Sequence, residues 1–180
     1  MTSEELELLK YPIGKFRFLN PPTETELETH IADIAQLPNR LMAATQGMSD
    51  LQLDTPYRPE GWTVRQLIHH IADSHLNCYI RFKVAATEVK PTITTYEEQL
   101  WAELSDGKHA PIDLSLSLLT ALHTRWIWFV KSLPISQLKE FAFLHPANGP
   151  MTLEKAIALY AWHSNHHLRH ITALKERNRW

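Results

Sequence analysis

Prolines punctuate this chain, and the stretches between them carry apolar side chains at helical spacing. The sequence contains eleven prolines and only five glycines. They separate four long amphipathic stretches, which are Thr23–Gln46, Thr63 to the residues before Pro91, Asp113–Ser132 and Thr152–Arg177. Four helices of this length in one domain most economically form a bundle. We therefore predict an all-α fold, a four-helix bundle, with one domain over residues 1–180.

The segments outside these stretches carry predictions of their own. The connection over residues 89–112 is long, and loops of that length are usually functional or contain a short extra helix. The N-terminal segment, residues 1–22, includes the apolar run Tyr11–Phe16, and we expect it to pack on the bundle across one end. Pro38 lies inside the first stretch, where a proline removes a helical hydrogen bond, so a kink is expected there.

Composition excludes several classes of protein. Eighteen basic residues balance twenty acidic ones, and no run of Lys or Arg is typical of a nucleic-acid-binding surface. The N-terminus is acidic where a signal peptide would be basic, and no apolar stretch approaches the roughly 20 residues that span a bilayer. The single cysteine, Cys78, excludes internal disulfides and is expected to be a small core residue. These features predict a cytoplasmic protein without nucleic-acid or membrane partners.

Eleven histidines are unusual for this length, and most of them cluster on two of the predicted helices. His163 and His167 are four residues apart, so on a helix their imidazoles can bind one metal ion. His166 and His170 have the same spacing. At about 100° per residue, His163 and His167 lie nearer the apolar stripe, whereas His166 is predicted to face solvent. This pattern alone leaves open whether the pair are ligands or ordinary polar residues.

The earlier cluster gives a less clear choice. His75 lies in the middle of the apolar stripe of its helix, which favours a buried histidine bonded to a neighbour. His70 lies to one side, on a polar line that suits the wall of a cleft and continues through Ser74, Asn77 and Arg81. His69 is predicted to lie on the surface. Periodicity alone would select His75 over His70.

Two motifs resemble a known family, the DinB-like superfamily, and within it the YfiT-like branch of metal-dependent hydrolases. The motifs are Trp62-Thr63-Val64-Arg65-Gln66-Leu67-Ile68-His69-His70-Ile71-Ala72-Asp73 and His163-Ser164-Asn165-His166-His167. The resemblance implies that His70, His163 and His167 bind the metal, with zinc or nickel as the ion. It also implies a four-helix bundle, often a homodimer, and for some relatives the transfer of a low-molecular-weight thiol such as bacillithiol.

Three neutral imidazoles leave an open position on the metal, which is typical of a catalytic site. The first hypothesis is a hydrolase acting on a small-molecule substrate through activated water. The alternative is a thiol S-transferase that conjugates a low-molecular-weight thiol to electrophiles, and a second alternative is a non-catalytic metal-binding module related to stress. No Glu stands inside the H-x-x-x-H motif, so metalloprotease chemistry is not supported.

No residue stands out as the general acid or base. The candidates are His123 on the apolar face of the third helix, His170 one turn beyond His167, and Asp73; for each, a packed or supporting role is the simpler interpretation. Arg81, with Asn77, could bind an acidic or amide-bearing substrate, or could pair with an acidic neighbour.

Overall fold

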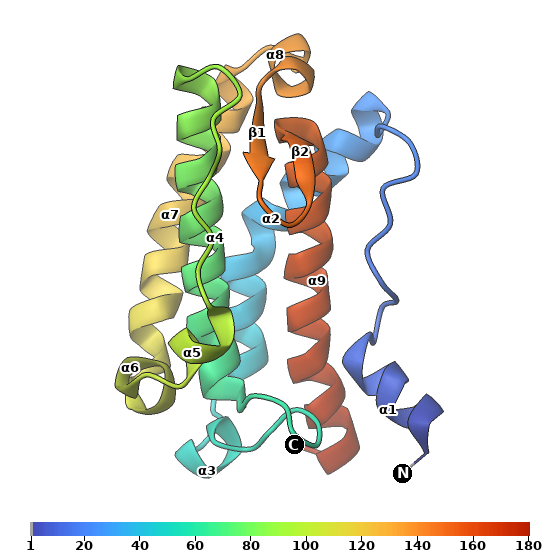
Figure 1. Ribbon diagram of the computed structural model, residues 1–180. Coiled ribbons are helices and arrows are strands. Elements are labelled where there is room, and N and C mark those ends of the chain that lie inside the picture. Colours follow the sequence, from blue (N-terminus) through green and yellow to red (C-terminus); the bar gives the residue numbers. More distant parts are fainter. Residues whose placement is uncertain (1) are drawn as a thin grey trace.

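The computed structural model describes residues 2–180, and its four long helices form a bundle (Figure 1). They are α2 (Glu24–Thr45), α4 (Val64–Thr87), α7 (Ile112–Ser132) and α9 (Leu153–Asn178). Helix α2 packs against α7 and α9, and α4 packs against the same two helices, so α2 and α4 lie diagonally opposite each other. The predicted all-α four-helix bundle is confirmed.

Threonine caps determine where three of the four helices begin. The side chains of Thr23 and Thr63 each accept a hydrogen bond from the backbone amide three residues later. In return, the side-chain oxygens of Glu26 and Gln66 accept a hydrogen bond from the backbone amide of the capping threonine, which completes a capping box. Thr152 caps α9 in the same way but without the return bond. The helix starts predicted from these threonines are confirmed within one residue.

Helix α2 continues through Pro38, which is buried in its interior. Figure 1 shows α2 changing direction between its first turns and its last turns. A proline has no amide hydrogen, so the carbonyl four residues earlier, that of Ile34, loses its usual helical donor. The consequence for His123, on the neighbouring helix α7, is described below.

Shorter helices and one hairpin connect or flank the four long helices. The helical ones are α1 (Ser3–Lys10), α3 (Asp50–Leu53), α5 (Glu98–Ala102), α6 (Ser105–His109) and α8 (Ile135–Glu140). The long connection thus contains two short helices, α5 and α6. A small antiparallel hairpin, β1 (Ala142–His145) and β2 (Gly149–Thr152), precedes α9. Backbone bonds of 2.8 and 3.0 Å join Leu144 of this hairpin to residues 91 and 93, which fastens the start of the long connection.

The N-terminal segment runs along the outer side of α9, as Figure 1 shows, and not across one end of the bundle. The indole Nε1 of Trp162 donates to the carbonyl of Gly14 at 3.1 Å. The ring of Phe16 packs against the same indole, and Tyr11 lies 6.2 Å from His166, measured between ring centroids. The segment therefore covers a face of α9 that periodicity assigns to solvent.

The core consists of two apolar clusters. One contains Phe82, Trp126 and Ile157, and the other contains Leu67 and Ile171. Each long helix contributes to both clusters, and on α4, α7 and α9 histidines lie between the two contributions. A layer of histidines thus crosses the middle of the bundle, in which His75 and His123 are buried and His163 is partly exposed. Among residues 2–180, no helix is both long and apolar enough to cross a membrane.

Candidate metal centre

Helices α4 and α9 bring His70, His163 and His167 together. One nitrogen from each ring lies within 4.8 Å of the other two. The Nε2 atoms of His163 and His167 are 3.0 Å apart, and the ring centroid of His70 lies 5.6 and 5.1 Å from theirs. A tetrahedral zinc ion bonded to such nitrogens would hold them roughly 3.3 Å apart. Small side-chain adjustments would therefore let the three nitrogens bind one ion.

Burial keeps these three imidazoles neutral. Desolvation lowers the pKa of His70 to about 4. It also lowers the pKa values of His163 and His167 well below the ordinary value, and the neighbouring histidines add to this effect. A neutral imidazole has a lone pair on one nitrogen, which is the form that binds a metal. At neutral pH the cluster consequently offers three uncharged nitrogen donors, and the donor set fits a divalent ion such as zinc or nickel.

His75 lies behind this group and does not belong to it. The side chain is fully buried, and its two ring nitrogens contact His123 at 2.9 Å and His163 at 3.1 Å. The prediction of a buried histidine bonded to a neighbour is confirmed. His123 is also buried, and its other nitrogen lies 2.6 Å from the carbonyl oxygen of Ile34. With both nitrogens bonded inside the core, His123 has no free atom to offer a substrate.

A second histidine group lies beside the first on α9. His166, His167 and His170 also have nitrogens within 4.8 Å of one another. His166 stacks on Trp162 at 4.5 Å, and His170 stacks on Tyr57 at 4.2 Å, as measured between ring centroids. The prediction that His166 faces solvent is wrong, because the side chain is only 7% exposed. The N-terminal segment covers it, and one helix's periodicity contains no information about that segment.

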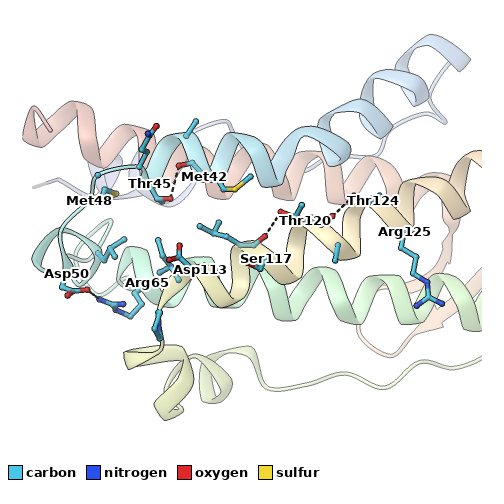
Figure 2. A pocket seen from close by; sticks show the side chains of 18 of the residues that line it. Met42, Thr45, Met48, Asp50, Arg65, Asp113, Ser117, Thr120, Thr124 and Arg125 are labelled. Atoms are coloured by element: carbon cyan, nitrogen blue, oxygen red, sulfur yellow. Dashed lines mark hydrogen bonds and ion pairs between the residues drawn. The ribbon is translucent and has the colours of Figure 1, made fainter.

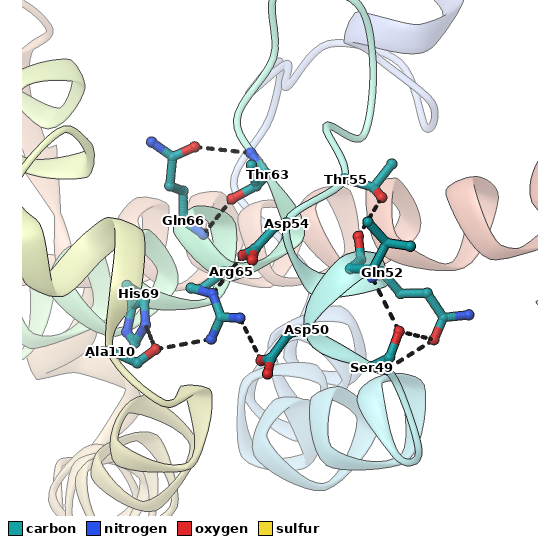
Figure 3. Close-up of polar contacts among 11 residues, drawn as sticks. Ser49, Asp50, Gln52, Asp54, Thr55, Thr63, Arg65, Gln66, His69 and Ala110 are labelled. Carbon is teal, nitrogen blue, oxygen red and sulfur yellow. Dashed lines mark hydrogen bonds and ion pairs between the residues drawn. The ribbon is translucent and has the colours of Figure 1, made fainter.

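The prediction for His69 is also wrong. Predicted to lie on the surface, His69 is buried, with Nδ1 2.7 Å from the hydroxyl of Ser115 and Nε2 3.1 Å from the carbonyl of Ala110. Figure 3 shows that the same carbonyl accepts from Arg65. The turn between α6 and α7 thus covers the side of α4 that periodicity leaves exposed.

Arg65 fastens the first turn of α4, five residues before His70. Its guanidinium donates to Asp54 at 2.6 Å and to Asp50 at 2.7 Å, and both partners belong to α3 or its cap (Figure 3). The Arg65 side chain is 7% exposed, whereas the carboxylates reach solvent. The network therefore fixes where α4 begins and how His70 is presented.

A pocket of about 500 Å³ reaches the metal-ligand candidates through His163, which is not fully buried. Its wall includes Arg81, Tyr96, His145 and Tyr160. The guanidinium of Arg81 donates to the carbonyl of Thr94 at 3.3 Å, and its Nε has no partner among the described residues. Burial raises the pKa of Tyr96 to about 12 and raises the pKa of Tyr160 well above its ordinary value, so both phenols stay protonated. The hydroxyl of Tyr160 donates to the carbonyl of Ser74 at 3.2 Å.

Other sequence candidates lie outside this pocket. Asp73 is half-buried, and burial raises its pKa to about 6, with a smaller contribution from Asp106. Asn77 donates to the carbonyl of Asp73 within its own helix. Cys78 is fully buried, and burial raises its thiol pKa, so it is the core residue that we predicted. None of these three residues lines the pocket at His163.

A larger cavity, about 1260 Å³, lies elsewhere, between α2 and α7 (Figure 2). Its labelled residues include Met42, Thr45, Ser117 and Arg125, and its lining contains no histidine. Cavity size alone would therefore have pointed away from the histidine clusters.

The bundle and its histidines define the class of protein: the chain belongs to the DinB superfamily, whose family model matches residues 33–171. Within that class it is 51% identical over 172 residues to proteins from Bacillus cereus and Bacillus anthracis named "Putative metal-dependent hydrolase". Each match covers 96% of this chain and 98% of the relative. The resemblance found in the sequence is confirmed.

A solved structure from the same genus has a closely similar fold. YfiT from Bacillus subtilis, described as a probable metal-dependent hydrolase with an unusual four-helix bundle topology, superposes with a TM-score of 0.92 at 45% identity. The superposition covers 96% of this chain and 99% of that one.

Proposed function

We propose that the protein is a metal-dependent hydrolase that holds one divalent ion through His70, His163 and His167. The observation that carries the proposal is the convergence of three ring nitrogens within 4.8 Å, with no carboxylate or thiol in the group. Three protein ligands leave a coordination position for water or substrate, which distinguishes catalytic from structural zinc sites. Zinc is the first choice of ion, and nickel also accepts three imidazoles. The names of the relatives support this proposal.

When bound, such an ion would lower the pKa of a coordinated water to about 7 and so supply hydroxide at neutral pH. The chain's own residues would bind and orient the substrate. His163 belongs both to the group of three histidines and to the pocket wall, so it would bring substrate close to a bound ion. The protonated phenol of Tyr96 lines the same pocket and could donate to a substrate oxygen, whereas the hydroxyl of Tyr160 already donates to the carbonyl of Ser74.

The pocket also supports a substrate class. Arg81 carries a permanent positive charge, and within residues 2–180 it forms no ion pair. A guanidinium with a free Nε favours an anionic group, because it can form charge-assisted hydrogen bonds to a carboxylate or a phosphate. We infer a small substrate with one acidic group, held so that its cleavable bond faces His163.

The same three ligands and Arg81 would also suit an acidic thiol, so thiol transfer to an electrophile is the alternative. To separate the two, metal-loaded protein is supplied with a panel of carboxylated esters and amides, and separately with several thiols plus monochlorobimane. Hydrolysis that is lost in His163→Ala supports the proposal. Thiol-dependent conjugation, lost in the same variant, with no hydrolysis of any ester or amide, would replace it with thiol transfer.

A non-catalytic metal-binding module is the second alternative. It predicts an ion closed off from solvent by a fourth protein ligand, with no turnover in either assay. The homodimer and the cytoplasmic location stay predictions. Sedimentation equilibrium of the metal-loaded protein tests the first, and fractionation of the producing cells tests the second.

A further inference from the structure

We propose that His75 and His123 are positioning residues, which together hold the ring of His163 in the tautomer and orientation that a metal ligand requires. The inference rests on the proposed metal site and assigns a role to two buried histidines outside it. Three imidazoles from α4, α7 and α9 are joined end to end by hydrogen bonds, and this relay ends at the backbone of α2.

At its α2 end, the relay meets a carbonyl that lacks its helical hydrogen bond. Because Pro38 has no amide hydrogen, the carbonyl of Ile34 lacks its normal helical donor. The Nδ1 atom of His123 lies 2.6 Å from that carbonyl oxygen. A carbonyl can only accept, so the proton of this hydrogen bond must belong to His123. His123 therefore supplies the hydrogen-bond donor that Pro38 removes from the carbonyl of Ile34, although Pro38 and His123 are 85 positions apart in the chain.

The direction of the remaining bonds follows from this first one. A neutral imidazole has a single N–H, so Nε2 of His123 accepts, and the donor 2.9 Å away is Nδ1 of His75. By the same reasoning Nε2 of His75 accepts from Nδ1 of His163 at 3.1 Å. Both inner rings, those of His75 and His123, are shielded from water, which disfavours a charged ring, and each has a nitrogen facing a nitrogen of another imidazole.

The last member of the relay is left with its Nε2 lone pair unprotonated. That atom faces Nε2 of His167 at 3.0 Å, inside the proposed metal site. Histidine ligands usually donate their other N–H to a carboxylate, a carbonyl or water, which fixes the tautomer and the ring orientation. Here His75 accepts that N–H, and His123 and Ile34 hold His75 in place.

A proton wire is a different role that the geometry does not support. The relay ends on a peptide carbonyl, which neither releases nor takes up a proton at neutral pH. The side chains of His75 and His123 are 0% and 1% exposed. Neither belongs to the pocket at His163. Their function is consequently to position His163 rather than to react.

The first test measures the tautomers directly in the unaltered protein. Protein labelled with ¹⁵N in its histidines is studied by long-range ¹H–¹⁵N NMR in metal-free and zinc-loaded forms. We expect His123, His75 and His163 to carry their protons on Nδ1 in both forms. A proton on Nε2 of His75 or His123 in the zinc-loaded protein would overturn the proposal, whether or not any variant folds.

The second test measures zinc affinity by competition with a chromophoric chelator. His75→Phe and His123→Phe should each weaken binding by roughly 10- to 100-fold. Because the two residues act through one relay, the double variant should lose little beyond His75→Phe alone. His75→Gln retains a donor and an acceptor, so it should recover much of the affinity lost in His75→Phe.

His69→Phe is the matched control, since His69 is a buried, hydrogen-bonded histidine of the same helix with partners outside the relay. It should bind zinc as the parent protein does. Wild-type affinity in a folded His75→Phe, or an equal loss in His69→Phe, would refute the positioning role. If the parent protein binds no metal, the proposed function fails, while the tautomer measurement still decides on the relay.

Discussion

The Nε2 atoms of His163 and His167 face each other across 3.0 Å on successive turns of α9. His166 and His170 repeat this arrangement at 3.1 Å, three residues further along the helix. Spacing and nitrogen separation therefore do not distinguish the two pairs. The position of His70 does, because α4 supplies the first pair with a third ligand from another helix, whereas the third member beside the second pair is His167 of the first pair.

Metal binding should stabilise the protein through the first pair. With free zinc about 100-fold above Kd, the free energy of unfolding should rise by about 2.7 kcal/mol. His163→Ala should lose this gain, which thermal unfolding with and without zinc can measure. His166→Ala is the control and should retain most of it. If His166→Ala loses the gain and His163→Ala keeps it, the ion binds at the second group.

Stability of the metal-free protein should fall in mild acid, and His123 should account for part of the fall. Its pKa is about 4 when folded and close to 6.5 when unfolded. Between these values the unfolded chain binds a proton that the folded one does not, so stability is complete above pH 6.5 and is lost as the pH falls toward 4. The loss from this residue is about 3 kcal/mol.

The check is denaturant unfolding at several pH values for the metal-free protein and for His123→Phe. As the pH falls, the free energy of unfolding of the variant should decline less steeply, because the proton taken up by His123 no longer contributes. Part of the decline should remain, because the other buried histidines still titrate. Identical slopes in the two proteins would contradict the assignment.

Arg81 should govern the preference for acidic substrates. Removing its charge in Arg81→Met should lower kcat/KM for a carboxylated ester by roughly 10- to 100-fold, mainly through KM, since one charge-assisted hydrogen bond is lost. The uncharged ester of the same alcohol should be little affected. An equal loss with both esters would mean that Arg81 supports the structure of the pocket without binding the substrate.

The Arg65 network should contribute to folding more than an exposed ion pair does. Arg65→Met should lower the free energy of unfolding by about 2 kcal/mol. The loss is small for the removal of a buried ion-pair partner, because Asp50 and Asp54 are 88% and 52% exposed and water can solvate them. Chemical denaturation measures the cost. Arg169→Met removes an exposed pair with Glu176 and should cost less than about 1 kcal/mol. Equal costs would contradict the structural role of Arg65.

The four long helices could be predicted from sequence because their signals are local. Thr23, Thr63 and Thr152 are caps, and the apolar spacing of each helix fixes its buried face. The hairpin at β1 and β2 was not predicted, since strands of four residues depend on pairing with each other and with the long connection.

The histidines could be predicted only in part, because their environments come from other segments. His69 and His166 were assigned to solvent from the periodicity of their own helices, whereas the α6–α7 turn and the N-terminal segment cover them. Periodicity correctly placed His75 in the core, but the resemblance to a family was needed to select His70 as the ligand candidate. Pro38 predicted a kink, and its link to His123 depends on how α2 and α7 pack.

The most direct test of the account is an anomalous-diffraction map from crystals of the zinc-loaded protein. It should show one strong peak per chain within bonding distance of one nitrogen each from His70, His163 and His167. A water or another non-protein ligand should complete the coordination. A peak held instead by His166, His167 and His170, or a fourth protein ligand that closes the site, would contradict the central claim.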